Sequence, residues 1–125
     1  MSMARADLLQ QYAEGWSKGD ANIIAASLDD NYQLDDPNSG SIPKAGLSKY
    51  LAGLVELVDN IRGTSGQQPF MEFTELVTSE EGNLLTAWAW WSIPNTSIQG
   101  AALIKVGDNG VVSERLAYYT PLPEG

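Results

Sequence analysis

Apolar side chains recur every three or four residues in three segments of the first half of the chain. This spacing is typical of amphipathic helices, because it places the apolar residues on one face. It predicts helices over residues 4–18, 21–28 and 43–60. Gly19 is a suitable stop for the first helix, and Asp20 is a suitable N-cap for the second.

The second half of the chain alternates with a period of two, which is typical of β-strands. Its strand-like runs are separated by the turn sequences EEGN, PNTS and GDNG, and the last of these favours a hairpin. A shorter extended segment precedes the third helix. The expected strands are residues 32–36, 70–78, 84–93, 98–106 and 111–119. This order predicts one α+β domain over residues 1–125, with helices covering one face of a curved, mostly antiparallel sheet.

Small side chains gather on one face of the predicted sheet, because side chains alternate across a strand. We expect this face to be the one that the helices cover. The small residues on it are Ala87, Ala89, Gly100, Ala102 and Ala117. Interiors normally fill such room with larger side chains. Either a ligand pocket lies above the small residues, or large helix residues fill the space; the candidates for filling it are Trp16, Tyr50 and Leu54.

The opposite face of the sheet is predicted to be strongly apolar. Its members are Trp88, Trp90, Leu103, Leu116 and Tyr118. A soluble monomer rarely leaves so large an apolar patch in water. The pattern therefore predicts a homodimer in which this outer face is covered by a second copy.

Composition narrows the possible chemistry. The 125 residues include no cysteine and no histidine, so proton transfer would have to use Asp, Glu, Tyr or Lys. We therefore expect no metal and no cofactor. The formal net charge of −9 argues against binding to nucleic acid. Without a run of about 20 apolar residues or a signal peptide, we expect no membrane segment and a cytoplasmic location.

The sequence NYQLDDP contains the best candidate for a catalytic base. Strand alternation turns Tyr32, Leu34 and Asp36 inward and leaves Gln33 and Asp35 in solvent. A desolvated carboxylate has a raised pKa, which suits a general base near neutral pH. The alternative is that the Asp36 side chain caps the turn that follows the strand.

Four segments of the chain resemble the cone-shaped superfamily named after nuclear transport factor 2, which includes SnoaL-like proteins and ketosteroid isomerases. They are QQYAEGWSKGD, DDNYQLDDP, AGLSKYL and VGDNGVVSERLAYYT. The resemblance implies a cone-shaped roll, with three N-terminal helices on a strongly curved sheet that encloses a pocket. Among ketosteroid isomerases, it implies that Asp36 is the general base and that Tyr12 donates a hydrogen bond in the oxyanion hole. It also implies that Tyr119 is an aromatic residue of the pocket.

The chain departs from the isomerase pattern at Ala102, where that family has a second, acidic oxyanion-hole donor. Loss of one such donor typically lowers the rate by a factor of about 10²–10³. Arg115 shares a predicted face with Ala117 and Tyr119. It could therefore hold a substrate carboxylate or enolate, pair with Asp36, or lie at the sheet margin with its charge in water.

The resemblance implies a cofactor-independent, isomerase-like enzyme that acts on a small hydrophobic carbonyl compound. The alternatives are a ligand-binding or dimerisation module without catalysis and a polyketide cyclase-like enzyme, because one fold hosts many functions. The residues expected to line the ligand pocket are Trp16, Tyr32, Leu34, Tyr50, Leu54, Ala87, Ala89, Trp91, Gly100, Ala102, Arg115 and Tyr119.

Overall fold

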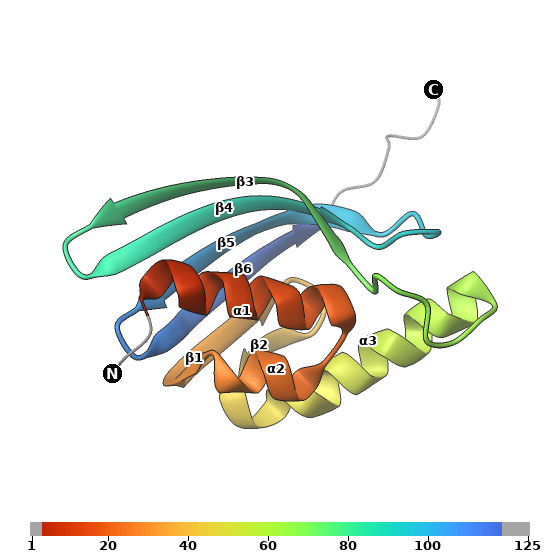
Figure 1. Cartoon of the computed structure of the whole chain (residues 1–125). Helices are drawn as coiled ribbons and strands as arrows, with labels where there is room; N and C mark the ends of the chain where they lie inside the picture. The colour runs from red at the N-terminus through yellow and green to blue at the C-terminus, as the bar shows by residue number, and fades with distance from the viewer. Residues whose placement is uncertain (1–3, 119–125) are drawn as a thin grey trace.

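Three α-helices cover one face of a curved, six-stranded sheet in the computed structural model, which describes residues 4–118 (Figure 1). Helix α1 lies across the concave side of the sheet, and α2 and α3 lie beside β1 and β2. The elements are α1 Arg5–Lys18, α2 Ala21–Ala26, β1 Leu28–Asp36, β2 Gly40–Pro43, the 3-10 turn η1 Lys44–Gly46, α3 Leu47–Arg62, β3 Glu72–Glu81, β4 Leu84–Ser92, β5 Gln99–Gly107 and β6 Gly110–Tyr118.

The strands follow the order β2-β1-β6-β5-β4-β3 across the sheet. Strand β1 runs parallel to β6, and the other neighbouring pairs are antiparallel. The predicted α+β architecture with a mostly antiparallel, curved sheet is therefore confirmed. Strand β2 was not predicted: its residues lie between the expected strand over residues 32–36 and the expected helix over residues 43–60, and they overlap the start of that helix. It pairs antiparallel with β1, from Gly40 opposite Asp36 to Pro43 opposite Gln33, and leads through η1 into α3.

The signals at the end of the first helix act as predicted. Gly19 has a φ of 65°, the left-handed conformation that favours glycine at a helix end. The Asp20 side chain accepts the backbone N–H groups of Asn22 at 2.9 Å and of Ile23 at 3.2 Å, which caps α2. Ile24 of the capped helix is completely buried.

A β-bulge near the start of β6 reverses the predicted orientation of that strand. Val106 pairs with Val111, but the preceding residue of β5, Lys105, pairs with Ser113, so β6 contains one extra residue. An extra residue turns every later side chain to the opposite face. Val111, before the bulge, is buried as strand alternation predicts. Glu114, three residues later, is also buried, although regular alternation would place it on the opposite face.

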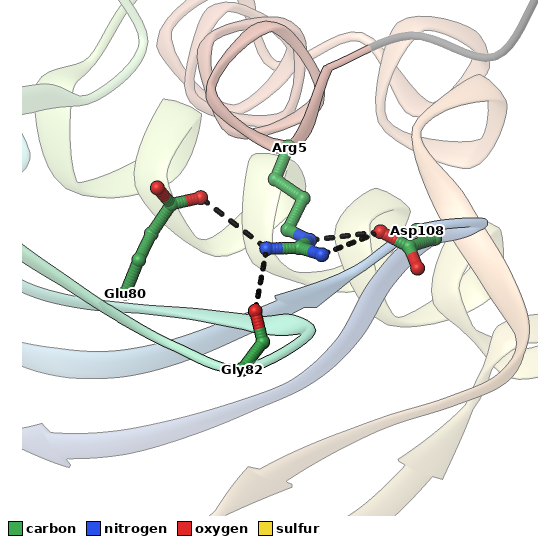
Figure 2. A network of polar contacts seen from close by, with 4 residues as sticks. All are labelled: Arg5, Glu80, Gly82 and Asp108. Atoms are coloured by element: carbon green, nitrogen blue, oxygen red, sulfur yellow. Dashed lines mark hydrogen bonds and ion pairs between the residues drawn. The ribbon is translucent and has the colours of Figure 1, made fainter.

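Arg5 fastens the beginning of α1 to the tips of two hairpins (Figure 2). Its Nε atom lies 2.9 Å from Asp108 Oδ1, in the β5–β6 turn. Its Nη1 atom lies 3.3 Å from the carbonyl oxygen of Gly82 and 3.4 Å from Glu80 Oε1, at the β3–β4 turn. We call this set of contacts the Arg5 clamp. It holds the beginning of α1 against the end of the sheet that carries the β3–β4 and β5–β6 turns.

Within residues 4–118, no helix is long and apolar enough to cross a membrane.

Candidate active site

Asp36 ends β1 and points inward, with only 5% of its surface exposed. Its Oδ1 atom accepts the backbone N–H of Asn38 at 2.7 Å. Its Oδ2 atom accepts the hydroxyl of Tyr118 at 2.9 Å and the hydroxyl of Tyr50 in a short hydrogen bond. The predicted inward orientation and the predicted turn cap are therefore both present, because one oxygen caps the turn and the other accepts hydroxyls from the interior.

A groove of about 730 Å³ opens beside Asp36, between α3, β2 and the turn after β1. Its walls are mostly apolar. Residues that define it include Asp36, Ile42, Lys49, Tyr50, Leu54, Leu57 and Tyr118. Among the lining residues that the structure describes, only Asp36 and Lys49 carry a formal charge. A cavity of this size can hold a small organic molecule.

The two tyrosines on Asp36 remain protonated at neutral pH. Burial, and then the hydrogen bond to Asp36, raise the pKa of the Tyr50 hydroxyl well above its ordinary value. Burial is also the main cause that raises the pKa of Tyr118 to about 12. Both residues therefore act as hydrogen-bond donors at the edge of the groove.

A second buried cluster joins Tyr12 of α1, Tyr32 of β1 and Glu114 of β6. The Tyr12 hydroxyl lies 2.6 Å from the Tyr32 hydroxyl and donates a short hydrogen bond to Glu114 Oε1. Since Tyr12 has one proton to donate, Tyr32 is the donor of the other bond. The pKa values of both tyrosines lie well above the ordinary value for tyrosine. Burial is the main cause, and the nearby Glu114 is the second.

Burial raises the pKa of Glu114 to about 7, although its hydrogen bond from Tyr12 opposes that shift. Protonated and ionised forms of this side chain therefore coexist near neutral pH. Sequence reasoning missed Glu114. The sequence did contain a clue to Glu114. It is an acidic residue in the middle of a strand, and strand alternation places it on the same face as Leu116 and Tyr118, which is the more apolar face of that strand.

A small inner cavity of about 20 Å³ lies behind the groove. Its own walls include Trp16, Met71, Trp91, Ile93, Glu114 and Leu116. It shares four lining residues with the groove: Tyr50, Leu54, Ile98 and Tyr118. The groove and the inner cavity are therefore separated by a single layer of side chains. Tyr12 lines neither of them, so it does not face one cavity together with Asp36.

The small residues of the sheet do not lie under the groove. Ala87, Ala89, Gly100 and Ala102 are buried on the helix-covered face, as alternation predicts, but they line neither the groove nor the inner cavity. A side chain at Gly100 would meet the Trp91 ring, which already occupies the space above it. Tyr32 and Leu34 are buried in the core and also line neither space. Of the predicted lining residues, Trp16, Tyr50, Leu54 and Trp91 do line one or both.

Arg115 does not share the inward face that strand parity predicted, because the bulge in β6 turns its side chain to the exposed face, which agrees with the alternative that its charge lies in water. Ala117 is exposed for the same reason. Over residues 4–118, Arg115 forms no ion pair with Asp36. Leu116 and Tyr118 were expected on the outer face, but both line the inner cavity. Tyr119 lies outside the described residues.

The outer face of the sheet keeps the two predicted tryptophans. Trp88 and Trp90 are 43% and 38% exposed, and their rings meet edge to face. Leu103 lies beside Trp88 in the neighbouring strand and is half-buried.

Across residues 4–118, no group of three or more acidic side chains is arranged to hold a metal ion.

Comparisons with known proteins identify the fold. No protein-family model and no curated protein matches the sequence. A nuclear transport factor 2-like protein of unknown function from Cytophaga hutchinsonii is 13% identical, with a TM-score of 0.62 over 95% of this chain and 93% of its own. A candidate polyketide cyclase from Xanthomonas campestris is 15% identical, with a TM-score of 0.63 over 92% and 90%. TerC, co-crystallised with polyporic acid, is 12% identical, with a TM-score of 0.65 over 92% and 91%. The chain thus has the cone-shaped fold of nuclear transport factor 2-like proteins.

Proposed function

We propose that the protein binds a small, mostly apolar carbonyl compound in the groove and that Asp36 moves a proton on the carbon next to the carbonyl group. The observation that carries this proposal is the arrangement around Asp36. A buried carboxylate stands at the wall of a largely apolar groove, and two tyrosyl hydroxyls meet on one of its oxygens.

In this proposal, Tyr50 and Tyr118 keep Asp36 from accepting a proton until a ligand binds. A carboxylate oxygen has two lone pairs, and the hydroxyls of Tyr50 and Tyr118 occupy both lone pairs of Asp36 Oδ2. When a ligand oxygen accepts one hydroxyl, a lone pair of Oδ2 becomes free. Oδ2 then takes a proton from the carbon, and the released electron pair forms an enolate whose oxygen is held by the tyrosine. Return of the proton to another carbon completes an isomerisation.

This assignment moves the hydroxyl donor from Tyr12 to the edge of the groove. The resemblance to ketosteroid isomerases gave that role to Tyr12, but its hydroxyl is completely buried and bonded to Glu114. Tyr50 and Tyr118 line the groove and already contact the base. The presence of candidate polyketide cyclases among proteins of this fold supports a role on carbonyl compounds. A cyclase would begin with the same proton abstraction.

Deuterium incorporation tests the proposal directly. Purified protein is incubated in D2O with a panel of saturated and unsaturated cyclic ketones, and uptake at the carbon next to the carbonyl is measured by mass spectrometry. We expect Asp36→Asn to lower the rate by a factor of about 10²–10⁴, the usual contribution of a general base. Asp35→Asn is the matched control, because Asp35 is its neighbour and belongs to neither space. Equal rates for wild type and Asp36→Asn would refute the role of Asp36.

Ligand-observed NMR separates catalysis from simple binding. Asparagine has nearly the same shape as aspartate, so Asp36→Asn should still bind the ketones that the wild type binds. Binding by both proteins without deuterium uptake by either would identify a ligand-binding module and would rule out the proposed chemistry on these ketones.

A further inference from the structure

Two residues that line the inner cavity carry buried polar groups without a hydrogen-bond partner among the described residues. The Nε1 atoms of Trp16 and Trp91 are buried, and no acceptor among residues 4–118 lies within hydrogen-bonding distance of either. Both rings form walls of the inner cavity. A buried N–H group without a partner costs about 1–3 kcal/mol, so native proteins rarely leave one unpaired. Two such groups in the same small cavity indicate a missing acceptor.

The cavity has the size of one oxygen-sized group. Its volume of about 20 Å³ is close to the minimum that holds a single water molecule. A ring cannot enter a space of this size, but a carbonyl oxygen can. A carbonyl oxygen has two lone pairs, which match the two indole N–H donors of Trp16 and Trp91. A ligand that reproduces the hydrogen bonds of the water it displaces keeps their contribution to affinity.

The inner cavity is within reach of a ligand in the groove. Tyr50 and Tyr118 line both spaces, and both are only partly buried. The Tyr118 ring also packs edge to face against Trp91, with ring centroids 5.4 Å apart. If the ligand takes the Tyr118 hydroxyl from Asp36, the movement of Tyr118 also disturbs the wall between the groove and Trp91.

We propose that the inner cavity is a subsite for a hydrogen-bond acceptor, in which the indole N–H groups of Trp16 and Trp91 hold a second oxygen of the ligand. This inference rests on the proposed function. It narrows the ligand class to apolar ring compounds that carry acceptor oxygens at both ends, such as diketones. One oxygen reacts beside Asp36, and the other is held at the inner end.

Two ketones that differ only at the far end test the subsite. The probes are 1-decalone and decalin-1,5-dione, and their affinities are measured by titration calorimetry. We expect Trp16→Phe and Trp91→Phe each to weaken binding of the dione by about fivefold, the usual effect of losing one hydrogen bond. Binding of the monoketone should not change, because phenylalanine removes the N–H but keeps most of the apolar ring.

Indole NMR provides an independent measurement on the wild-type protein, so the test does not depend on the stability of the variants. The chain has four tryptophans, and each gives one Nε1–H resonance. After sequence-specific assignment, the dione should shift the resonances of Trp16 and Trp91. Those of Trp88 and Trp90 on the outer face serve as internal controls.

The possible outcomes distinguish this inference from the proposed function. Binding of both ketones without a shift at Trp16 and Trp91, or equal weakening of both by the two substitutions, would overturn the subsite and leave the groove proposal intact. Failure of both ketones to bind would contradict the proposed function itself.

Discussion

Glu114 should make the stability of the protein decrease as pH rises, which is the opposite of the usual behaviour of a carboxylate. The side chain is buried, and its pKa is raised from an ordinary 4.5 to about 7. Between these two values the folded protein keeps a proton that the unfolded chain has released. Because the folded state binds more protons there, the free energy of unfolding falls as pH rises through this range.

The magnitude follows from the size of the shift. One pKa unit corresponds to about 1.4 kcal/mol of difference between the protonation states. A rise from 4.5 to about 7 therefore gives a contribution of about 3 kcal/mol. It is fully present below pH 4.5 and is lost by about pH 8. Glu114→Gln removes this contribution, because the amide is neutral throughout, and its carbonyl oxygen can still accept the Tyr12 hydroxyl.

Urea unfolding followed by circular dichroism at pH 4, 5.5, 7 and 8.5 measures the effect. The decisive quantity is the stability of Glu114→Gln minus that of wild type, which should increase by about 3 kcal/mol from pH 4 to pH 8.5. Taking the difference removes the contributions of the other carboxylates. Glu56→Gln, an exposed position on α3, is the control and should show a constant difference. A constant difference for Glu114→Gln as well would refute the assignment of a raised pKa to Glu114.

Four other substitutions probe the fold and the assembly. Asp20→Ala should cost about 1 kcal/mol in urea unfolding, because it removes the α2 cap; no loss would contradict the cap. Gly100→Ala should cost about 3 kcal/mol or fail to fold, since its Cβ would overlap the backbone carbonyl of Ala117, and wild-type stability would refute this packing. Arg5→Met should cost less than about 1 kcal/mol, and the loss should shrink in high salt, because its acidic partners are largely exposed. We also propose a homodimer through the outer sheet face: wild type should sediment as a dimer at micromolar concentration and Trp88→Glu as a monomer, whereas a monomeric wild type would contradict the interface.

The sequence predicted the architecture well because its long elements have clear periodicity. The helix over residues 4–18 and the strand pattern of residues 84–93 required only local alternation of apolar and polar positions. Strand β6 shows where this reasoning fails. Its orientation depends on one extra residue near Val112, and a bulge leaves no signal in the alternation of a sequence that reads VVSE. That single residue determines whether Arg115 or Glu114 enters the interior.

The candidate site was only partly predictable for a related reason. Asp36 could be identified because strand alternation and the following proline constrain it locally. Its partners Tyr50 and Tyr118 come from positions 14 and 82 residues further along the chain. Their meeting depends on how α3 and β6 pack against β1, which no local pattern contains. The separation of Tyr12 from the groove is likewise a property of tertiary packing.

The Arg5 clamp also bears on how the chain folds. Arg5 and Asp108 are 103 residues apart in sequence, so their contact closes nearly the whole described chain. A contact of such long range is expected to form late, after the hairpins that carry Glu80 and Asp108 are in place. Interactions absent from the folding transition state slow unfolding and have little effect on the folding rate. The clamp would therefore slow unfolding modestly, by at most the few-fold that a loss of less than about 1 kcal/mol allows, and would leave the folding rate nearly unchanged.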